Sequence, residues 1–100
     1  MENPPNENVR THVWVKGHVQ GVGFRAHVEY HAGRIGVNGW VRNVGRDTVE
    51  AVAEGTQPQI EQFIAMMKSG PNISRVDEAR VEYEDVITGE FTGFGVKRSL

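Results

Sequence analysis

A glycine-rich stretch that ends in an arginine carries the strongest chemical signal in this sequence. Gly17, Gly21 and Gly23 precede Arg25, which lies in the first turn of a helix that the apolar spacing predicts from Phe24. Glycines allow a loop to curl, so that unpaired N–H groups at the helix start converge on one anion. Arg25 would add a planar guanidinium that binds phosphate at two points. The stretch predicts a small phosphate or carboxylate site, with a plain glycine-rich turn and a solvated arginine as the alternative.

A second segment ends in a residue that suits the handling of water: it reads Gly39-Trp40-Val41-Arg42-Asn43. The Asn43 amide can donate and accept hydrogen bonds at once. It could therefore hold a water through its carbonyl or donate to a substrate oxygen. The alternative is an asparagine that caps a turn, a common role for this residue type.

Hydrophobic periodicity indicates which elements position these residues. Apolar residues alternate with polar ones in the predicted strands, and recur every three or four residues in the predicted helices. The predicted strands are 9–19, 37–44, 48–53, 76–84 and 94–97, and the predicted helices are 24–35 and 57–69. Thr56 and Gln59 form a possible capping box before the second helix, and Gly36 and Gly70 follow the two helices.

The order of these elements is β-α-β-β-α-β followed by a short terminal strand. It predicts an α+β fold of the ferredoxin-like, split βαβ type, in which an antiparallel sheet carries two helices on one face. Residues 9–100 would form this domain, and residues 1–8, which have nothing to bury, would form a flexible tail. The fold serves many functions and does not assign one.

Composition limits the classes of function. The chain has 100 residues, no cysteine and a net charge of -2 at pH 7, which fits one domain without disulfides or thiolate metal sites. The slightly acidic balance argues against a nucleic-acid partner. No apolar run is long enough for a membrane span, and the N-terminal residues do not resemble a signal peptide. We therefore expect a cytoplasmic protein.

Together the two segments resemble the paired signatures of the acylphosphatase family. The first signature is matched by Val19-Gln20-Gly21-Val22-Gly23-Phe24-Arg25, preceded by Gly17. The second is matched by Gly39-Trp40-Val41-Arg42-Asn43, followed by Val49 and Gly55. The resemblance covers about residues 9–98, and it implies a small, single-domain protein of the ferredoxin-like fold.

The resemblance also implies an activity, namely hydrolysis of acyl phosphates to a carboxylate and inorganic phosphate by in-line attack of water. It assigns phosphate binding to Arg25 and the positioning of the attacking water to Asn43. It places the phosphate cradle in the backbone of Gln20, Gly21, Val22, Gly23, Phe24 and Arg25. It implies no metal, no cofactor, only small-molecule partners, and a monomer. The alternative is a non-catalytic anion-binding or regulatory module of the same fold.

The predicted hairpin turn departs from the family pattern. Asp47 stands two residues before Val49, where the family usually has glycine, and Gly45 lies two residues earlier. Aspartate tolerates left-handed backbone better than most residues. We expect an altered turn type at this point, and a shifted turn could tilt Asn43.

Three histidines and two tryptophans have ordinary as well as functional interpretations. His27 and His31 have the spacing of metal ligands on a helix, but no third ligand is evident, which favours solvated or packing roles. His18 lies next to the predicted cradle and could tune anion binding. The tryptophans, Trp14 and Trp40, could stack on bases, but the aromatic strand motif of RNA-binding domains is absent.

Overall fold

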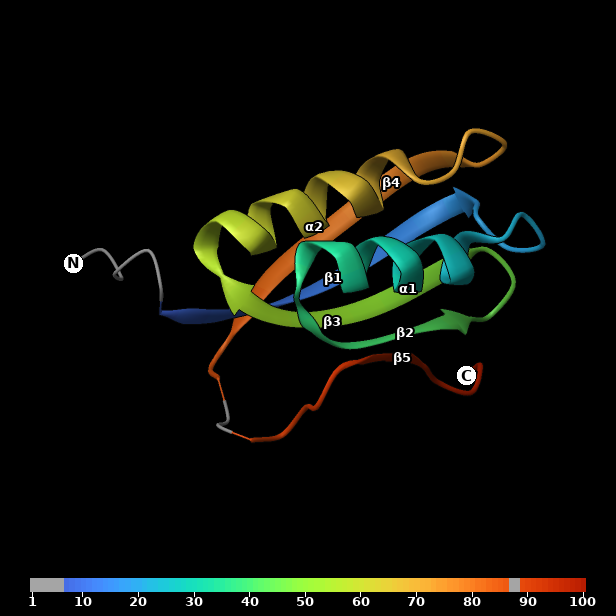
Figure 1. Cartoon of the computed structure of the whole chain (residues 1–100). Helices are drawn as coiled ribbons and strands as arrows, with labels where there is room; N and C mark the ends of the chain where they lie inside the picture. The colour runs from blue at the N-terminus through green and yellow to red at the C-terminus, as the bar shows by residue number, and fades with distance from the viewer. Residues whose placement is uncertain (1–6, 87–88) are drawn as a thin grey trace.

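The structure is a computed structural model that describes residues 7–86 and 89–100, with two helices on one face of a sheet (Figure 1). The elements are β1 (Asn8–His18), α1 (Phe24–Ile35), β2 (Asn38–Val44), β3 (Thr48–Thr56), α2 (Gln57–Ser69), β4 (Arg75–Glu84) and β5 (Phe94–Val96). Both helices have the predicted bounds. Of the predicted tail, residues 1–6 lie outside the described residues, and Asn8 already belongs to β1. No helix in the described ranges is long and apolar enough to cross a membrane.

Local signals determine where the helices begin and end. α1 ends at Gly36, whose φ of 95° is a left-handed conformation that glycine adopts without a steric penalty. α2 begins after Thr56, whose hydroxyl accepts a hydrogen bond from the Gln59 backbone N–H. The Gln59 side chain in turn accepts one from the Thr56 backbone N–H. This capping box, predicted from the sequence, satisfies two N–H groups at the start of the helix.

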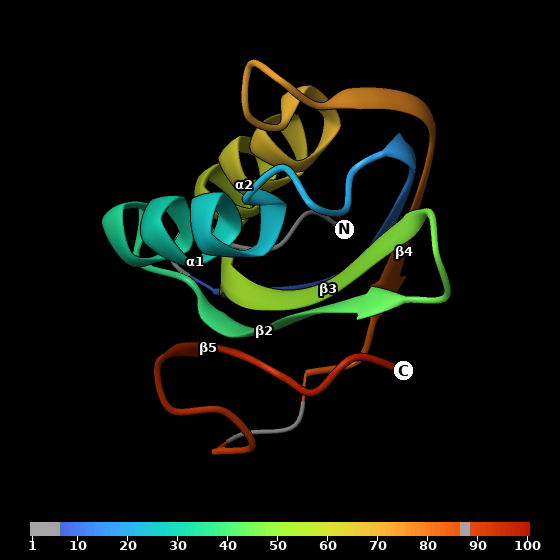
Figure 2. The same ribbon diagram turned by 90° about the vertical axis from the view of Figure 1, so that its right-hand side faces the viewer.

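The sheet has the strand order β4-β1-β3-β2-β5. β1 pairs antiparallel with β3 and β4, and β2 pairs antiparallel with β3. This part confirms the predicted ferredoxin-like sheet. β5 adds a parallel pairing with β2, so the sheet is mixed, which the sequence pattern did not predict. The chain passes from β4 to the opposite edge of the sheet before it forms β5 (Figure 2). The turn predicted near residues 88–89 lies partly outside the described residues.

The core lies between the two helices and the sheet face that they cover. Val13 and Val15 of β1 are fully buried, as their alternation predicts. Each helix contributes side chains at helical spacing: Phe24, Val28 and Ala32 from α1, and Ile60, Phe63 and Met67 from α2. This packing fixes the start of α1 against the sheet, and with it the residues of its first turn.

The edge strand β4 contributes less to the core than its alternation predicts. Val81 packs against the core, but Ala79 is exposed and Tyr83 is 55% exposed. β4 has a neighbouring strand on one side only. Alternation identifies which side chains share a face, but it does not show how far a helix covers that face.

On the sheet face opposite the helices, aromatic and charged side chains cover one another. The Arg80 guanidinium lies 4.2 Å from the centre of the Trp14 ring, and His12 stacks on the same ring at 3.8 Å. Trp40 is covered by Arg42 at 4.8 Å and by Lys97 at 4.4 Å. These contacts favour the structural interpretation of both tryptophans over base stacking.

Candidate active site

The loop between β1 and α1 forms one wall of the candidate site. After β1 ends at His18, Gly21 and Gly23 take left-handed backbone conformations with φ of 74° and 76°. Gly23 is the N-cap of α1, and no described side chain caps this helix end. The first N–H groups of α1 are therefore available to an anion at the positive end of the helix dipole.

Buried side chains hold this loop in place. Val19 is fully buried, and Val22 and Phe24 are almost fully buried, whereas Gly21 and Gly23 are exposed. The loop thus alternates between residues that anchor it in the core and glycines that leave its backbone accessible. Such a backbone is held in one conformation before an anion arrives, which lowers the ordering cost of binding.

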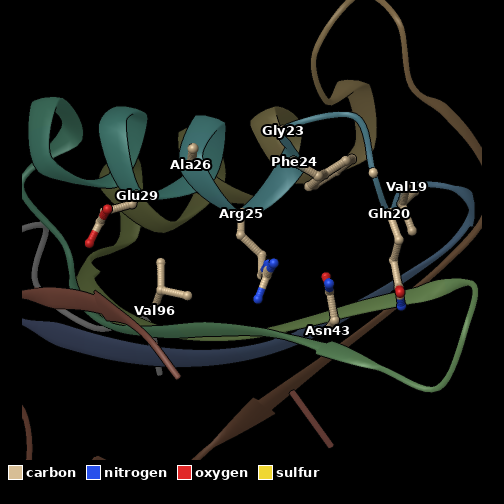
Figure 3. A pocket seen from close by; sticks show the side chains of 10 residues that line it. Val19, Gln20, Gly23, Phe24, Arg25, Ala26, Glu29, Asn43 and Val96 are labelled. Carbon is tan, nitrogen blue, oxygen red and sulfur yellow. The ribbon is translucent and has the colours of Figure 1, made fainter. Parts of the chain in front are cut away.

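Arg25 and Asn43 point into the same space between α1 and β2 (Figure 3). Arg25 comes from the first turn of α1, and Asn43 comes from the end of β2. In the β2–β3 ladder Asn43 is paired with Val49, which is fully buried beneath the helices. Directly paired residues project to the same face of a sheet, so the ladder directs Asn43 towards α1.

Arg25 and Asn43 line a hollow of about 350 Å³. The rest of its lining consists of Val19, Gln20, Gly21, Gly23, Phe24, Ala26, Glu29 and Val96. Of the predicted cradle residues, only Val22 does not line the hollow. Four lining residues were not among the predicted site residues: Val19, Ala26, Glu29 and Val96. Helical spacing from Arg25 could have indicated Glu29, but no local signal places β5 beside the hollow.

The Gln20 side chain ties the loop to the β2–β3 hairpin, a role that sequence reasoning missed. Its Nε2 donates to the backbone carbonyls of Val44, Gly45 and Thr48, at 3.4, 3.2 and 3.0 Å. These carbonyls belong to the end of β2, the turn and the start of β3. Since Asn43 immediately precedes them, the Gln20 side chain helps to fix the separation between the cradle loop and Asn43.

The hairpin turn is built on Gly45 and not on Asp47. Gly45 has a φ of 60°, and none of the described non-glycine residues has a positive φ. The pairing of β2 with β3 continues without a shift through Asn43 and Val49, so Asn43 keeps its regular place in the ladder. The Asp47 carbonyl accepts a hydrogen bond of 2.9 Å from the Gly17 N–H. The turn therefore leaves Asn43 in the regular register of the ladder, and the bond from Gly17 ties the turn to β1.

Residues 99 and 100 also contact the site. The Leu100 N–H donates to the Asn43 carbonyl at 2.9 Å, and the Gly45 N–H donates to the Leu100 carbonyl at 3.0 Å. Arg25 Nη1 donates to the Ser99 hydroxyl at 3.4 Å. The contact with Leu100 uses the backbone carbonyl of Asn43, and the Asn43 side chain remains directed into the hollow (Figure 3).

Comparisons with known proteins show the family of the chain. The acylphosphatase family model matches residues 11–96. The chain belongs to the acylphosphatase family. It is 48% identical over 92 residues to an acylphosphatase of Pyrobaculum islandicum, and the alignment covers 90% of this chain and 95% of that relative. An acylphosphatase of Syntrophus aciditrophicus is 47% identical over 87 residues, which are 87% of this chain and 90% of the relative.

A solved member of the family has the same architecture. The crystal structure of acylphosphatase from Bacillus subtilis is 31% identical and matches with a TM-score of 0.83, covering 89% of this chain and 98% of that chain. The family resemblance read from the two signatures and the ferredoxin-like fold read from the element order are both confirmed.

The remaining histidine candidates do not line the hollow. The His27 and His31 rings lie 4.4 Å apart on α1. Among the residues that the structure describes, no group of three His, Cys, Asp or Glu could hold a metal ion. Burial lowers the pKa of His27, and the neighbouring charge of His31 lowers it further. His18 is exposed and lies outside the hollow.

His12 belongs to an ionic network on the sheet face away from the hollow. Its Nε2 lies 2.6 Å from a Glu50 oxygen, and its Nδ1 lies 2.8 Å from a Glu84 oxygen. Glu50 also accepts a hydrogen bond of 2.6 Å from Arg42. Burial raises the pKa of Glu50, but hydrogen bonds from Arg42 and His12 and their charges outweigh burial and hold it below its usual value. This network has a structural role.

Proposed function

We propose that the chain hydrolyses the carboxyl–phosphate anhydride of small acyl phosphates, with Arg25 binding the phosphate and Asn43 positioning the attacking water. Curated acylphosphatases match it over most of their length, so the chain is a hydrolase that acts on acid anhydrides. One observation carries the assignment of residues: Arg25 and Asn43, from two separate elements, line the same hollow as the glycine-rich loop.

The geometry supports a division of labour within this hollow. The backbone of the cradle loop and the first N–H groups of α1 would hold the phosphate oxygens, and the Arg25 guanidinium would bind them from the side of the helix. The Asn43 amide would hold a water in line with the bond that breaks. The water oxygen bonds to phosphorus, the P–O bond to the acyl group breaks, and the carboxylate leaves with the bonding electron pair.

The proposed reaction needs no strong general base and no metal ion. A loose phosphoryl transition state depends mainly on positioning and on stabilisation of charge at the phosphate oxygens. The carboxylate is a good leaving group, and a phosphate oxygen of the substrate can accept the proton of the water. Arg25 and the helix N-terminus supply the positive charge that the transition state requires.

Hydrolysis of benzoyl phosphate in the presence of EDTA tests this proposal. Arg25→Ala should lower kcat/KM by about 100-fold or more and weaken inhibition by inorganic phosphate. Asn43→Ala should lower kcat while inhibition by phosphate is retained, because Asn43 would act on the water. Arg34→Ala in α1 and Asn38→Ala in β2 are matched controls, since neither residue lines the hollow. Loss of activity with EDTA, or equal loss of phosphate affinity in both site variants, would contradict the assigned roles.

The alternative is a non-catalytic anion-binding module of the same fold, which would bind phosphate without turnover. The presence of both Arg25 and Asn43 in one hollow favours the enzyme. The predictions of a monomer, of a cytoplasmic location and of no nucleic-acid partner stay predictions. Sedimentation equilibrium, cell fractionation and a filter-binding assay at low and moderate salt test them in turn.

A further inference from the structure

The hollow has a second end, which the proposed hydrolysis mechanism does not use. Ala26 and Glu29 of α1 and Val96 of β5 line this end. In Figure 3, Val96 and Glu29 lie on the side of Arg25 away from Asn43. Two small or apolar side chains and one carboxylate therefore border the space beyond the arginine. We call these three residues the outer subsite.

In-line chemistry determines what would occupy the outer subsite. The attacking water and the leaving oxygen lie on opposite sides of phosphorus in the transition state. If Asn43 holds the water, the leaving carboxylate points away from Asn43, past Arg25. The acyl group attached to that carboxylate then extends towards Ala26, Glu29 and Val96.

The charge of the outer subsite is set by Glu29. Among the described residues, Glu29 takes part in none of the ion pairs, although Arg25 precedes it by one helical turn. Arg25 and Glu29 are the charged residues of the lining. When a phosphate neutralises Arg25, the acyl group faces an uncompensated carboxylate.

We infer that the outer subsite selects acyl phosphates with an uncharged or cationic acyl group over those with an anionic one, and that Glu29 sets this preference. The inference rests on the proposed hydrolysis and names the class of its substrates. Val96 and Ala26 provide apolar contact for the acyl chain, and Glu29 repels a second carboxylate. Glu29 is exposed, so solvent and salt weaken the repulsion, and we expect a preference of about three- to tenfold.

Two substrates that differ only in a remote charge test the inference. Benzoyl phosphate has a neutral acyl group, and 4-carboxybenzoyl phosphate adds one carboxylate at the far end of the ring. Wild-type protein should have a kcat/KM about three- to tenfold higher for the neutral substrate at low salt, and a ratio closer to one at high salt. Glu29→Gln should bring the ratio towards one at low salt. Glu61→Gln removes the same charge from α2, away from the hollow, and should leave the wild-type ratio unchanged.

Binding measurements separate this inference from the proposed hydrolysis. Non-hydrolysable phosphonate analogues of the two substrates can be titrated into wild-type protein and Glu29→Gln by calorimetry. If neither substrate is hydrolysed but the neutral phosphonate binds more tightly in a manner that depends on Glu29, the hydrolysis proposal fails and the subsite stands. A ratio of kcat/KM or of Kd that is the same in wild type and Glu29→Gln overturns the subsite, as does the absence of binding by both phosphonates.

Discussion

Replacing Gly39 by alanine should destabilise the protein, because the backbone of β3 occupies the space that the new methyl group needs. A Cβ at Gly39 would lie 1.9 Å from the Val52 carbonyl oxygen and 3.0 Å from the Ala53 Cα. Gly39 also has a φ of 148°, which L-residues rarely adopt. Since both neighbours are backbone, relief of the clash requires β2 and β3 to move apart.

The expected size of this effect follows from the two penalties. Overpacking a close-packed region costs about 1–3 kcal/mol, and a backbone conformation that is unfavourable for an L-residue adds about 1–2 kcal/mol. We therefore expect the free energy of unfolding to fall by about 3 kcal/mol, which lowers Tm by about 12–24 °C in a domain of this size. Because Asn43 lies further along the same strand, the protein that remains folded should also be less active.

Urea unfolding followed by circular dichroism measures the change, and Gly33→Ala is the matched control. Gly33 lies within α1, where an added Cβ would meet nothing within 4 Å. Alanine is favoured over glycine in a helix by about 1 kcal/mol, so this control should become more stable. A Gly39→Ala variant that is as stable as the wild type would refute the argument that the glycine of the second signature serves close strand approach.

Three further predictions concern the loop, the second helix and the open sheet face. Gln20→Ala should lower kcat/KM about tenfold and should lower the free energy of unfolding by only about 1 kcal/mol, because the cradle loses its hydrogen bonds to the hairpin. Steady-state kinetics measure the first effect, and urea unfolding measures the second. Thr56→Ala should lower the free energy of unfolding by about 1 kcal/mol, with kcat unchanged, because it removes the capping hydroxyl. The pKa of Glu50 is lower in the folded than in the unfolded protein. The ionised Glu50 carboxylate therefore stabilises the folded protein at pH values above the pKa of the unfolded state, and this stabilisation is lost as the pH falls through the pKa of the folded state. Urea unfolding at a series of acidic pH values should therefore show a shallower loss of stability in Glu50→Gln than in wild type.

Features that depend on signals within a few residues could be predicted from the sequence. The bounds of both helices follow from apolar spacing, from the pair Thr56 and Gln59, and from the glycines that come after each helix. The parallel pairing of β5 could not be predicted, because it depends on which edge of the sheet the chain reaches. The exposure of Tyr83 likewise depends on how far the helices extend over β4, and alternation contains no information about that.

The candidate site divides in the same way. Arg25 and Asn43 could be singled out because their segments carry recognisable patterns, and sheet alternation is enough to put Asn43 on the helix face. The tie from Gln20 to the hairpin and the place of Val96 beside Arg25 are products of tertiary packing. A glutamine side chain that bonds carbonyls far along the chain has no local signature. The placement of Arg25 and Asn43 in the hollow was therefore more predictable than the contacts that support it.

The position of β1 between β4 and β3 has a consequence for how fast the protein folds. β1 pairs with β4, so that Arg10 meets Glu84 and His18 meets Arg75 across most of the length of the chain. Contacts of such high sequence separation form only after a large loss of chain entropy, and proteins rich in them fold in milliseconds to seconds, not in microseconds. The cradle loop extends from β1, and Asn43 lies on a strand joined to β1 only through β3. A refolding experiment should therefore recover enzymatic activity no sooner than it recovers the native sheet.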